Sequence, residues 1–124
     1  MRKLSEFEKC KLSFPDCIVE DMQYAISSEF VKIKINSGYL SIDGGIELRS
    51  CGLFFKNWEL VKARLYRTKT KEWEDLSEGD VEKLADICEF KYENGNVVLS
   101  GFGKESWQWI EISFTNAVLD VECD

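Results

Sequence analysis

Short runs in which apolar and charged residues alternate recur along this chain, and turn-forming residues separate them. The clearest run is Phe30–Ile35, where three β-branched residues alternate with two lysines. A period of two places alternate side chains on opposite faces of a strand, so this pattern is typical of half-buried antiparallel strands. The chain is therefore predicted to be mainly β.

The same alternation, with β-branched and aromatic enrichment, predicts most of the remaining strands. Residues 58–67 fit a helix or a strand, and their composition favours a strand. Asn94-Gly95 is a strong hairpin signal, so the last third is predicted to be a β-meander in which Ile110, Ile112 and Phe114 face the core. The predicted strands, in addition to Phe30–Ile35, cover residues 16–24, 39–42, 46–55, 58–67, 89–93, 96–103, 107–115 and 118–123.

One segment, residues 77–89, has the helical period instead. Ser77 precedes Asp80 by three residues, as in a capping box, and apolar residues follow at 81, 84, 85 and 88. The predicted fold class is mainly β, with α+β as the alternative. It is an antiparallel meander that forms a sandwich or a strongly curved sheet, with one helix (about 77–89) packed on it.

The 124 residues suit a single domain, 1–124, and a hydrophobic content of 44% can build a core without metals or disulfides. The chain has no histidine, the commonest general base and metal ligand. We therefore expect no enzyme, no catalytic residues, no metal site and no cofactor. Gly101-Phe102-Gly103 lacks the third glycine and the following helix of a dinucleotide fingerprint, so it is interpreted as a bulge or strand end.

The five cysteines are odd in number and widely spaced, which favours free thiols in a reducing cytoplasm over a disulfide framework. Cys17, Cys51 and Cys88 have apolar neighbours and are expected to be small core residues. The first residues lack the apolar run of a signal peptide, and no uncharged run reaches membrane-span length. We expect a cytoplasmic protein with no membrane partner.

Charge is unevenly distributed along the chain. With 23 acidic and 16 basic residues the net charge is −7, which argues against direct nucleic-acid binding. Residues 54–71 hold 6 basic and 1 acidic residue, whereas residues 72–93 hold 2 basic and 9 acidic ones. The acidic run either forms a negative patch that steers a basic partner or is neutralised by the basic run on a neighbouring strand.

Tryptophans accompany these acids. Trp73 lies within the acidic run, and Trp107, Trp109, Glu111 and Ser113 are expected to share the less buried face of their strand. That face is either covered by a second layer or exposed to a partner, in which case tryptophans are suitable anchors. The candidate partner-binding residues are Glu72, Trp73, Glu74, Asp75, Glu78, Asp80, Glu82, Trp107, Trp109 and Glu111.

Over roughly residues 13–123 the chain resembles small bacterial immunity proteins of polymorphic toxin systems, including contact-dependent growth inhibition systems. The pattern is carried mainly by Leu99–Gly103, by Trp109-Ile110-Glu111 and by Phe114–Ala117. The resemblance implies a cytoplasmic antitoxin that binds a cognate toxin domain, often a basic nuclease, and blocks its active site or substrate surface. It carries over no individual binding residues.

Two other functions stay open. Trp107 and Trp109 could stack on sugar rings in a ligand-binding, carbohydrate-type β module. An enzyme would have to use carboxylates or tyrosines alone, with Glu111 as the most obvious candidate.

Overall fold

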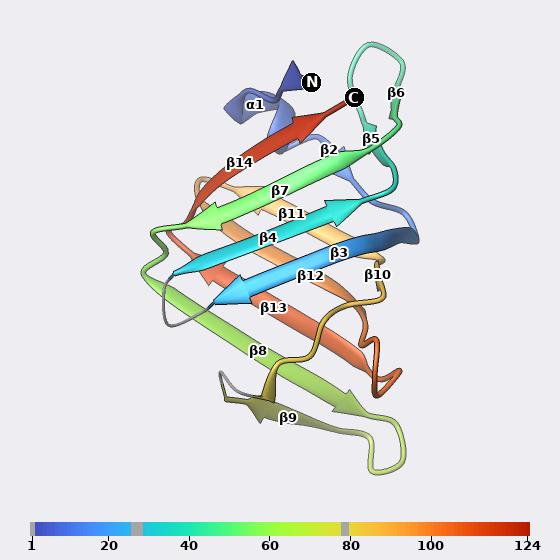
Figure 1. The fold of residues 1–124 in the computed structure, drawn as a ribbon, viewed down its shortest axis with the longest axis vertical. Helices are drawn as coiled ribbons and strands as arrows, with labels where there is room; N and C mark the ends of the chain where they lie inside the picture. Colours follow the sequence, from blue (N-terminus) through green and yellow to red (C-terminus); the bar gives the residue numbers. More distant parts are fainter. Residues whose placement is uncertain (1, 26–28, 78–79) are drawn as a thin grey trace.

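The structure is a computed structural model that describes residues 2–25, 29–77 and 80–124. Antiparallel strands dominate it, as the alternation predicts (Figure 1). A six-stranded sheet pairs strands from both ends of the chain, so the two termini lie side by side. Its order is β1 (Arg2–Lys3), β14 (Val118–Cys123), β7 (Cys51–Lys56), β4 (Phe30–Ile35), β3 (Cys17–Ala25) and β10 (Asp86–Ile87).

A five-stranded sheet forms the second layer. Its order is β11 (Glu89–Glu93), β12 (Asn96–Phe102), β13 (Trp109–Thr115), β8 (Leu60–Arg67) and β9 (Glu72–Leu76). A small third sheet near the termini contains β2 (Leu12–Ser13), β5 (Gly38–Leu40) and β6 (Ile46–Leu48).

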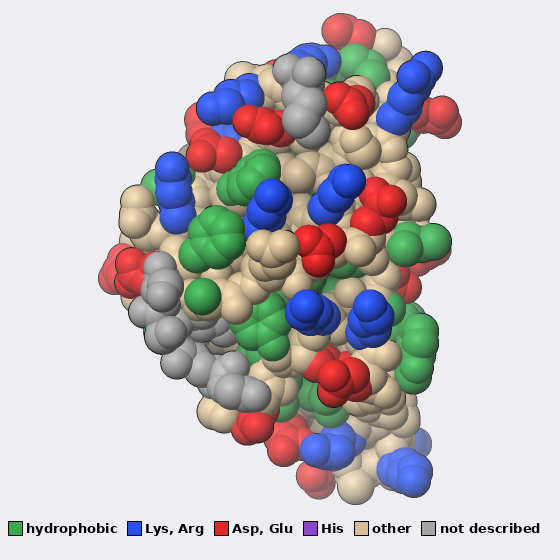
Figure 2. Space-filling model, viewed as in Figure 1, with side chains coloured by type: hydrophobic (Ala, Val, Ile, Leu, Met, Phe, Trp, Pro, Cys, Tyr) green, Lys and Arg blue, Asp and Glu red, His purple; other side chains and the backbone are tan. Residues whose placement is uncertain are grey.

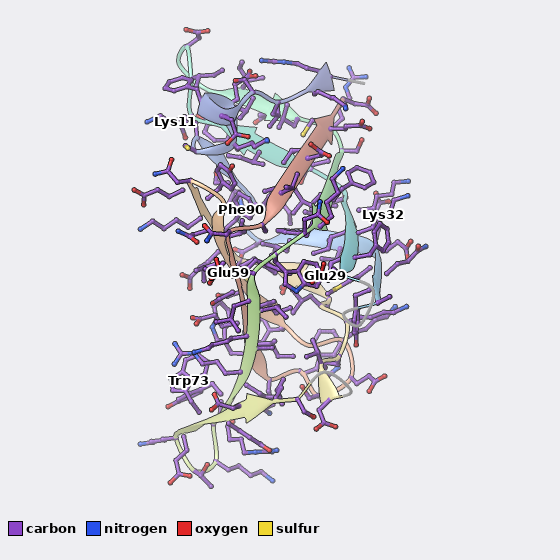
Figure 3. The ribbon with its side chains drawn as sticks, turned by 90° about the vertical axis from the view of Figure 1, so that its left-hand side faces the viewer. Lys11, Glu29, Lys32, Glu59, Trp73 and Phe90 are labelled. Carbon is purple, nitrogen blue, oxygen red and sulfur yellow. The ribbon has the colours of Figure 1, made fainter. Side chains whose placement is uncertain are left out.

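The two large sheets pack face to face. Phe55 of β7 stacks on Phe114 of β13 with ring centroids 4.4 Å apart and an interplanar angle of 15°. Ile110 and Ile112 also face inward, as predicted, and are 0% and 4% exposed. The core therefore lies between the sheets, and each sheet has an outer face. Trp73 lies on the outer face of the five-stranded sheet and Lys32 on that of the six-stranded sheet, at opposite sides of the molecule (Figure 3).

The strand predictions are largely confirmed. Phe30–Ile35 is β4 over its full predicted length, and the segment that fitted either helix or strand forms β8. Predicted strand 46–55 is two strands, β6 and β7. The edge strand β9 was not predicted, because its sequence reads as a run of acids around Trp73.

The helix predicted at about 77–89 is wrong. Residues 78–79 lie outside the described residues, and residues 80–88 run as an irregular segment that contains β10. Ser77 and Asp80 do meet, with Ser77 Oγ donating to Asp80 Oδ2 at 2.7 Å, but this bond joins two side chains, whereas a capping box joins each side chain to the backbone of the other residue. No helix follows this contact.

Residues 82–88, which we call the crossing segment, do not form a helix because their backbone groups bond to neighbouring strands. Ala85 N donates to Phe102 O at 2.8 Å, while Ala85 O accepts from Val19 N at 3.0 Å. Cys88 N donates to Ser100 O at 2.8 Å. The segment is thus bonded to β12 on one side and to β3 on the other, and these bonds replace those within a helix.

Two glycines make room for this crossing. A Cβ at Gly101 would overlap the Asp86 carbonyl oxygen, and one at Gly103 would overlap the Glu82 carboxylate. Gly101-Phe102-Gly103 is therefore the end of a strand against which a second segment packs, in agreement with its interpretation from sequence.

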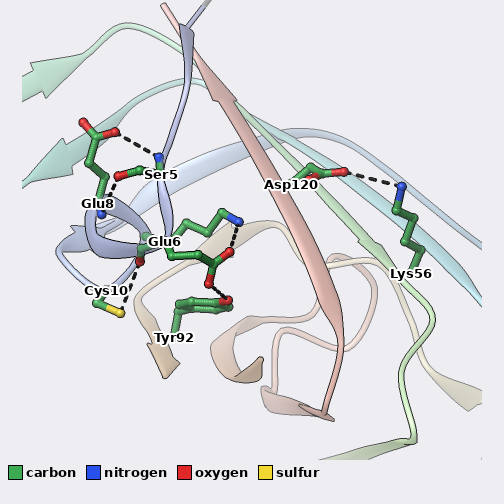
Figure 4. Close-up of polar contacts among 8 residues, drawn as sticks. Ser5, Glu6, Glu8, Cys10, Lys56, Tyr92 and Asp120 are labelled. Atoms are coloured by element: carbon green, nitrogen blue, oxygen red, sulfur yellow. Dashed lines mark hydrogen bonds and ion pairs between the residues drawn. The ribbon is translucent and has the colours of Figure 1, made fainter. Parts of the chain in front are cut away.

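The helix among the described residues is α1 (Glu6–Lys9), which is capped by Ser5 and Glu8 (Figure 4). Its buried Lys9 bonds Glu6 at 2.6 Å, and Glu6 also contacts the Tyr92 hydroxyl. Burial and the Glu6 carboxylate raise the pKa of Tyr92 to about 12, while Lys9 and then Tyr92 lower the pKa of Glu6. This cluster fastens the N-terminal segment to β11.

Candidate interaction face

Four aromatic residues form a continuous row across the outer face of the five-stranded sheet. In the strand register Phe102 lies opposite Trp109, Trp109 lies opposite Tyr66, and Tyr66 lies opposite Trp73. Neighbouring strands lie about 4.8 Å apart, so the row crosses β12, β13, β8 and β9 without a gap. We call these four residues the aromatic row.

The rings of the aromatic row pack edge to face. Phe102 and Trp109 have centroids 5.3 Å apart at 81°, and Tyr66 and Trp73 have centroids 5.2 Å apart at 64°. Such tilted pairs are favoured by the charge distribution of the rings. The end members are well exposed, Phe102 by 39% and Trp73 by 42%, whereas the two central rings are half-buried. Each end ring of the row therefore packs against its central neighbour and keeps an exposed surface.

A polar row runs beside it on the same face, with Glu111 opposite Arg64 and Arg64 opposite Asp75. Arg64 Nε donates to Glu111 Oε1 at 3.0 Å. The Arg64 guanidinium also lies 3.9 Å from the centre of the Trp73 ring. Lys62 and Ser113 complete a shallow depression here. Within the polar row Arg64 thus bonds Glu111 and packs against the Trp73 ring.

Strand alternation aims these side chains outward. Ala63 and Leu65 of β8 are 9% and 6% exposed, which leaves Arg64 and Tyr66 on the opposite face. In β13 the inward Ile110 and Ile112 likewise leave Trp109 and Glu111 outside.

The structure brings together four of the candidate residues predicted from sequence: Trp73, Asp75, Trp109 and Glu111. Glu72 and Glu74 lie on the other face of β9, where Glu74 pairs with Arg67. The predicted sharing of one face by Trp107 and Trp109 is wrong, because Trp107 precedes β13, with φ of 58°, and alternation does not reach it.

The remaining candidates lie elsewhere. Trp107 is 65% exposed in its turn. Glu82 is used internally, since its Oε1 accepts from the backbone N of Glu105 and Ser106 at 2.9 and 2.8 Å. Asp80 accepts from Ser77, and Glu78 lies outside the described residues.

Sequence reasoning missed Arg64, Tyr66 and Phe102. The first two follow from the alternation of residues 58–67 once that segment is taken as a strand. Phe102 could be found only from the pairing of β12 with β13, because no spacing in the sequence links it to Trp109.

The basic and acidic runs meet on the β8–β9 hairpin. Arg67 lies opposite Glu72 and forms an ion pair with Glu74, and Arg64 lies opposite Asp75. Of the two alternatives for these charges, this geometry favours mutual neutralisation over an isolated negative patch.

The outer face of the six-stranded sheet is different in character. Figure 2 shows lysine and arginine side chains interspersed with hydrophobic ones over it. Lys32 lies 5.4 Å from the centre of the Phe54 ring, and Lys56 pairs with Asp120 at 3.6 Å. Among the described residues of this sheet, no row of aromatic side chains crosses neighbouring strands.

The core offers no room for a ligand at the void between the sheets, which measures about 20 Å³ and is lined by apolar residues of both layers. An apolar cavity that binds a molecule of benzene's size measures about 150 Å³. Among residues 2–25, 29–77 and 80–124, no group of three cysteine, aspartate or glutamate side chains is placed to hold a metal ion.

Fold and site together define a β protein of two packed antiparallel sheets with an exposed aromatic face on one of them. Comparison of the chain with models of protein families, with curated proteins and with solved structures finds no match. In the described part of the chain, no helix is both long and apolar enough to cross a membrane.

Proposed function

We propose that this protein is an immunity protein that binds a cognate bacterial toxin domain and blocks its active site or its substrate surface. The observation that carries the proposal is the aromatic row, with Arg64 packed against Trp73. The resemblance of residues 13–123 to immunity proteins supplies the kind of partner. On this proposal the protein acts by occupying a surface and performs no chemistry.

The composition of the face supports protein binding. Tryptophan, tyrosine and arginine are the residues that most often dominate the energy of protein interfaces. Their side chains here are already held by one another, with edge-to-face contacts and the Arg64–Glu111 hydrogen bond. Side chains ordered before binding lose less entropy on association, which strengthens the complex.

Net charge supports a basic partner. The value of −7 attracts a positively charged nuclease domain over a distance of about one Debye length, roughly 8 Å at physiological salt. Because the hairpin charges neutralise one another, this steering comes from the whole molecule, while affinity comes from the aromatic row.

A cytoplasmic location belongs to the same proposal. All five cysteines are free, and Cys17, Cys51 and Cys123 are buried without forming disulfides. Free buried thiols are typical of proteins that work in a reducing compartment.

The test is co-expression with a candidate toxin domain encoded beside the gene. The expected result is rescue of growth and a purified complex. Trp73→Ala and Trp109→Ala should each weaken binding by about 30-fold or more, the effect of losing about 2 kcal/mol at an interface hot spot. Phe54→Ala, an aromatic truncation on the opposite sheet, is the matched control and should leave affinity unchanged. A toxin that neither binds nor is neutralised rejects the proposal.

A carbohydrate-binding module is the second candidate, because an exposed aromatic row is also what sugar rings stack on. Two features weigh against it. The rings are tilted by 64° and 81° to their neighbours instead of forming a flat platform, and Arg64 covers one face of Trp73. Binding on a glycan array that is lost in Trp109→Ala would favour this second function.

A further inference from the structure

Two cysteines face each other across neighbouring strands of the six-stranded sheet. Cys51 begins β7 and Cys123 ends β14, and the register places them directly opposite. Both side chains point into the core and are 1% exposed. Their Sγ atoms share a hydrogen bond of 2.6 Å.

The pair occupies the closer of the two kinds of antiparallel position. Asp124 N donates to Ser50 O at 3.0 Å, which makes the next pair along, Ser50 and Asp124, a hydrogen-bonded one. Since the two kinds alternate, Cys51 and Cys123 form a non-hydrogen-bonded pair, in which the Cα atoms lie about 4.5 Å apart. That separation falls within the range of Cα distances across disulfides.

We propose that Cys51 and Cys123 are a site of reversible oxidation, which low-molecular-weight disulfides convert to a disulfide between β7 and β14. The Cys123 thiolate attacks one sulfur of the reagent, forms a mixed disulfide and releases one thiolate. Cys51 then attacks the Cys123 sulfur and releases the second. The protein pair loses two electrons, the reagent gains them, and the two thiol protons pass to the released thiolates.

The surroundings favour Cys123 as the attacking sulfur. The hydrogen bond with Cys51 lowers the pKa of Cys123, and the charge of Arg2 adds to this effect. Arg2 lies opposite Cys123 in the register of β1 with β14. The neighbouring sulfur and burial raise the pKa of Cys51, which keeps that thiol protonated until the mixed disulfide forms.

Access comes from the position of the pair at the end of the sheet. Cys123 is the last residue of β14, and among the described residues the strand that pairs with the outer edge of β14 is the two-residue β1. Strand ends open locally at little cost, so a small reagent can reach Cys123 without unfolding of the whole protein.

None of the other cysteines lies opposite a cysteine in the strand register. Cys10 is exposed and would carry a mixed disulfide only. Cys17 is contacted by Ser37 Oγ at 3.1 Å. Burial, together with the nearby carboxylates of Asp16 and Asp86, raises the pKa of Cys88 to about 12, which disfavours attack by this thiol.

The disulfide would tie the C-terminal strand to the middle of the sheet. It joins residues 72 positions apart, and a link that closes so long a loop reduces the entropy of the unfolded chain. The oxidised protein is therefore expected to melt at a higher temperature than the reduced one.

In the experiment, the folded protein is treated with oxidised glutathione, the remaining thiols are blocked after unfolding, and the digested protein is mapped by mass spectrometry. We expect a peptide that links Cys51 to Cys123, and the link itself lowers the mass of the protein by two hydrogen atoms; a glutathione adduct at Cys10 would add its own mass. The melting temperature should rise on oxidation and fall back to its starting value on reduction. Cys88→Ser should keep the link, and Cys123→Ser should lose it.

The proposal is overturned if, after oxidation, the peptide map shows Cys51 and Cys123 both carrying the blocking group, or if it shows Cys51 linked to Cys17 instead. The map of the wild-type protein decides this by itself, even if a serine variant fails to fold. No toxin takes part, so the outcome is independent of the proposed function.

Discussion

Arg64 serves two neighbours at once: its guanidinium lies 3.9 Å from the centre of the Trp73 ring, and its Nε donates to Glu111 at 3.0 Å. It therefore connects the edge strand β9 to the central strand β13. Among the described residues β9 is the last strand of its sheet, and the Arg64 and Tyr66 side chains of the neighbouring strand both contact the Trp73 ring. The exposed end of the aromatic row is ordered by a cation from the polar row.

The first prediction is a measurable coupling between Arg64 and Trp73. A double-mutant cycle of Arg64→Ala and Trp73→Ala, followed by urea denaturation, should give an interaction energy of about 0.5–1 kcal/mol, the usual size of an exposed cation–π contact. The Lys32 and Phe54 pair, whose separation is longer at 5.4 Å, is the control cycle and should give less. A coupling near zero for Arg64 and Trp73 would mean that the ring is not held by the cation.

The strands could be predicted because alternation of side chains is local. In Phe30–Ile35 every second residue is β-branched and buried, so the residues themselves determine the face. The site was predicted only in part, because the arrangement of its residues depends on which strands pair with each other. Trp73, Asp75, Trp109 and Glu111 attract notice by residue type, but that they share one face depends on the pairing of β9, β8 and β13. The register of β13 against β8 joins residues more than 40 positions apart, so no local spacing in the sequence shows which residues it places side by side.

The helix prediction failed because the apolar residues between 80 and 89 fit a helical face and are also buried by a segment that is not helical. Val81 and Leu84 are buried as a helical face requires, but Ile87, which that face leaves out, is 0% exposed. Backbone bonds to β3 and β12 decide the outcome, and they come from residues more than ten positions away in the chain. Local propensity is a weak preference that such bonds override.

A second prediction separates the crossing segment from a helix. Ile87→Ala should lower the free energy of unfolding by about 3 kcal/mol, because the side chain is fully buried and its loss leaves a cavity. Cys88→Ala, at a partly exposed position that a helix would bury, should cost about 1 kcal/mol or less. Chemical denaturation of both variants measures the difference. The reverse order of the two effects would favour the helix.

A third prediction concerns Gly101. Its missing Cβ admits the Asp86 carbonyl, which is backbone and cannot rotate away. Gly101→Ala should therefore lower the free energy of unfolding by about 3 kcal/mol, the upper end for an overpacked site. Gly52→Ala is the matched control in β7, where a Cβ would meet the Phe54 ring at 3.2 Å and the Glu122 carbonyl oxygen at an ordinary contact distance of 3.9 Å, so its cost should be smaller. Equal stability of the two variants would show that residues 82–88 do not pack against β12.

The last prediction is a loss of stability at high pH that depends on Tyr92. Its pKa rises from 10.0 to about 12, first because the phenol is buried and next because it bonds Glu6. The folded state then holds the phenolic proton more tightly than the unfolded chain does. This contribution to the free energy of unfolding is fully present below about pH 10 and is lost as the pH rises toward 12. The loss amounts to about 2–3 kcal/mol. Tyr92→Phe should remove that slope, so denaturation curves of the two proteins should converge as the pH rises from about 8 to 12. Curves that stay parallel over this range would show that Tyr92 titrates alike in the folded and unfolded states.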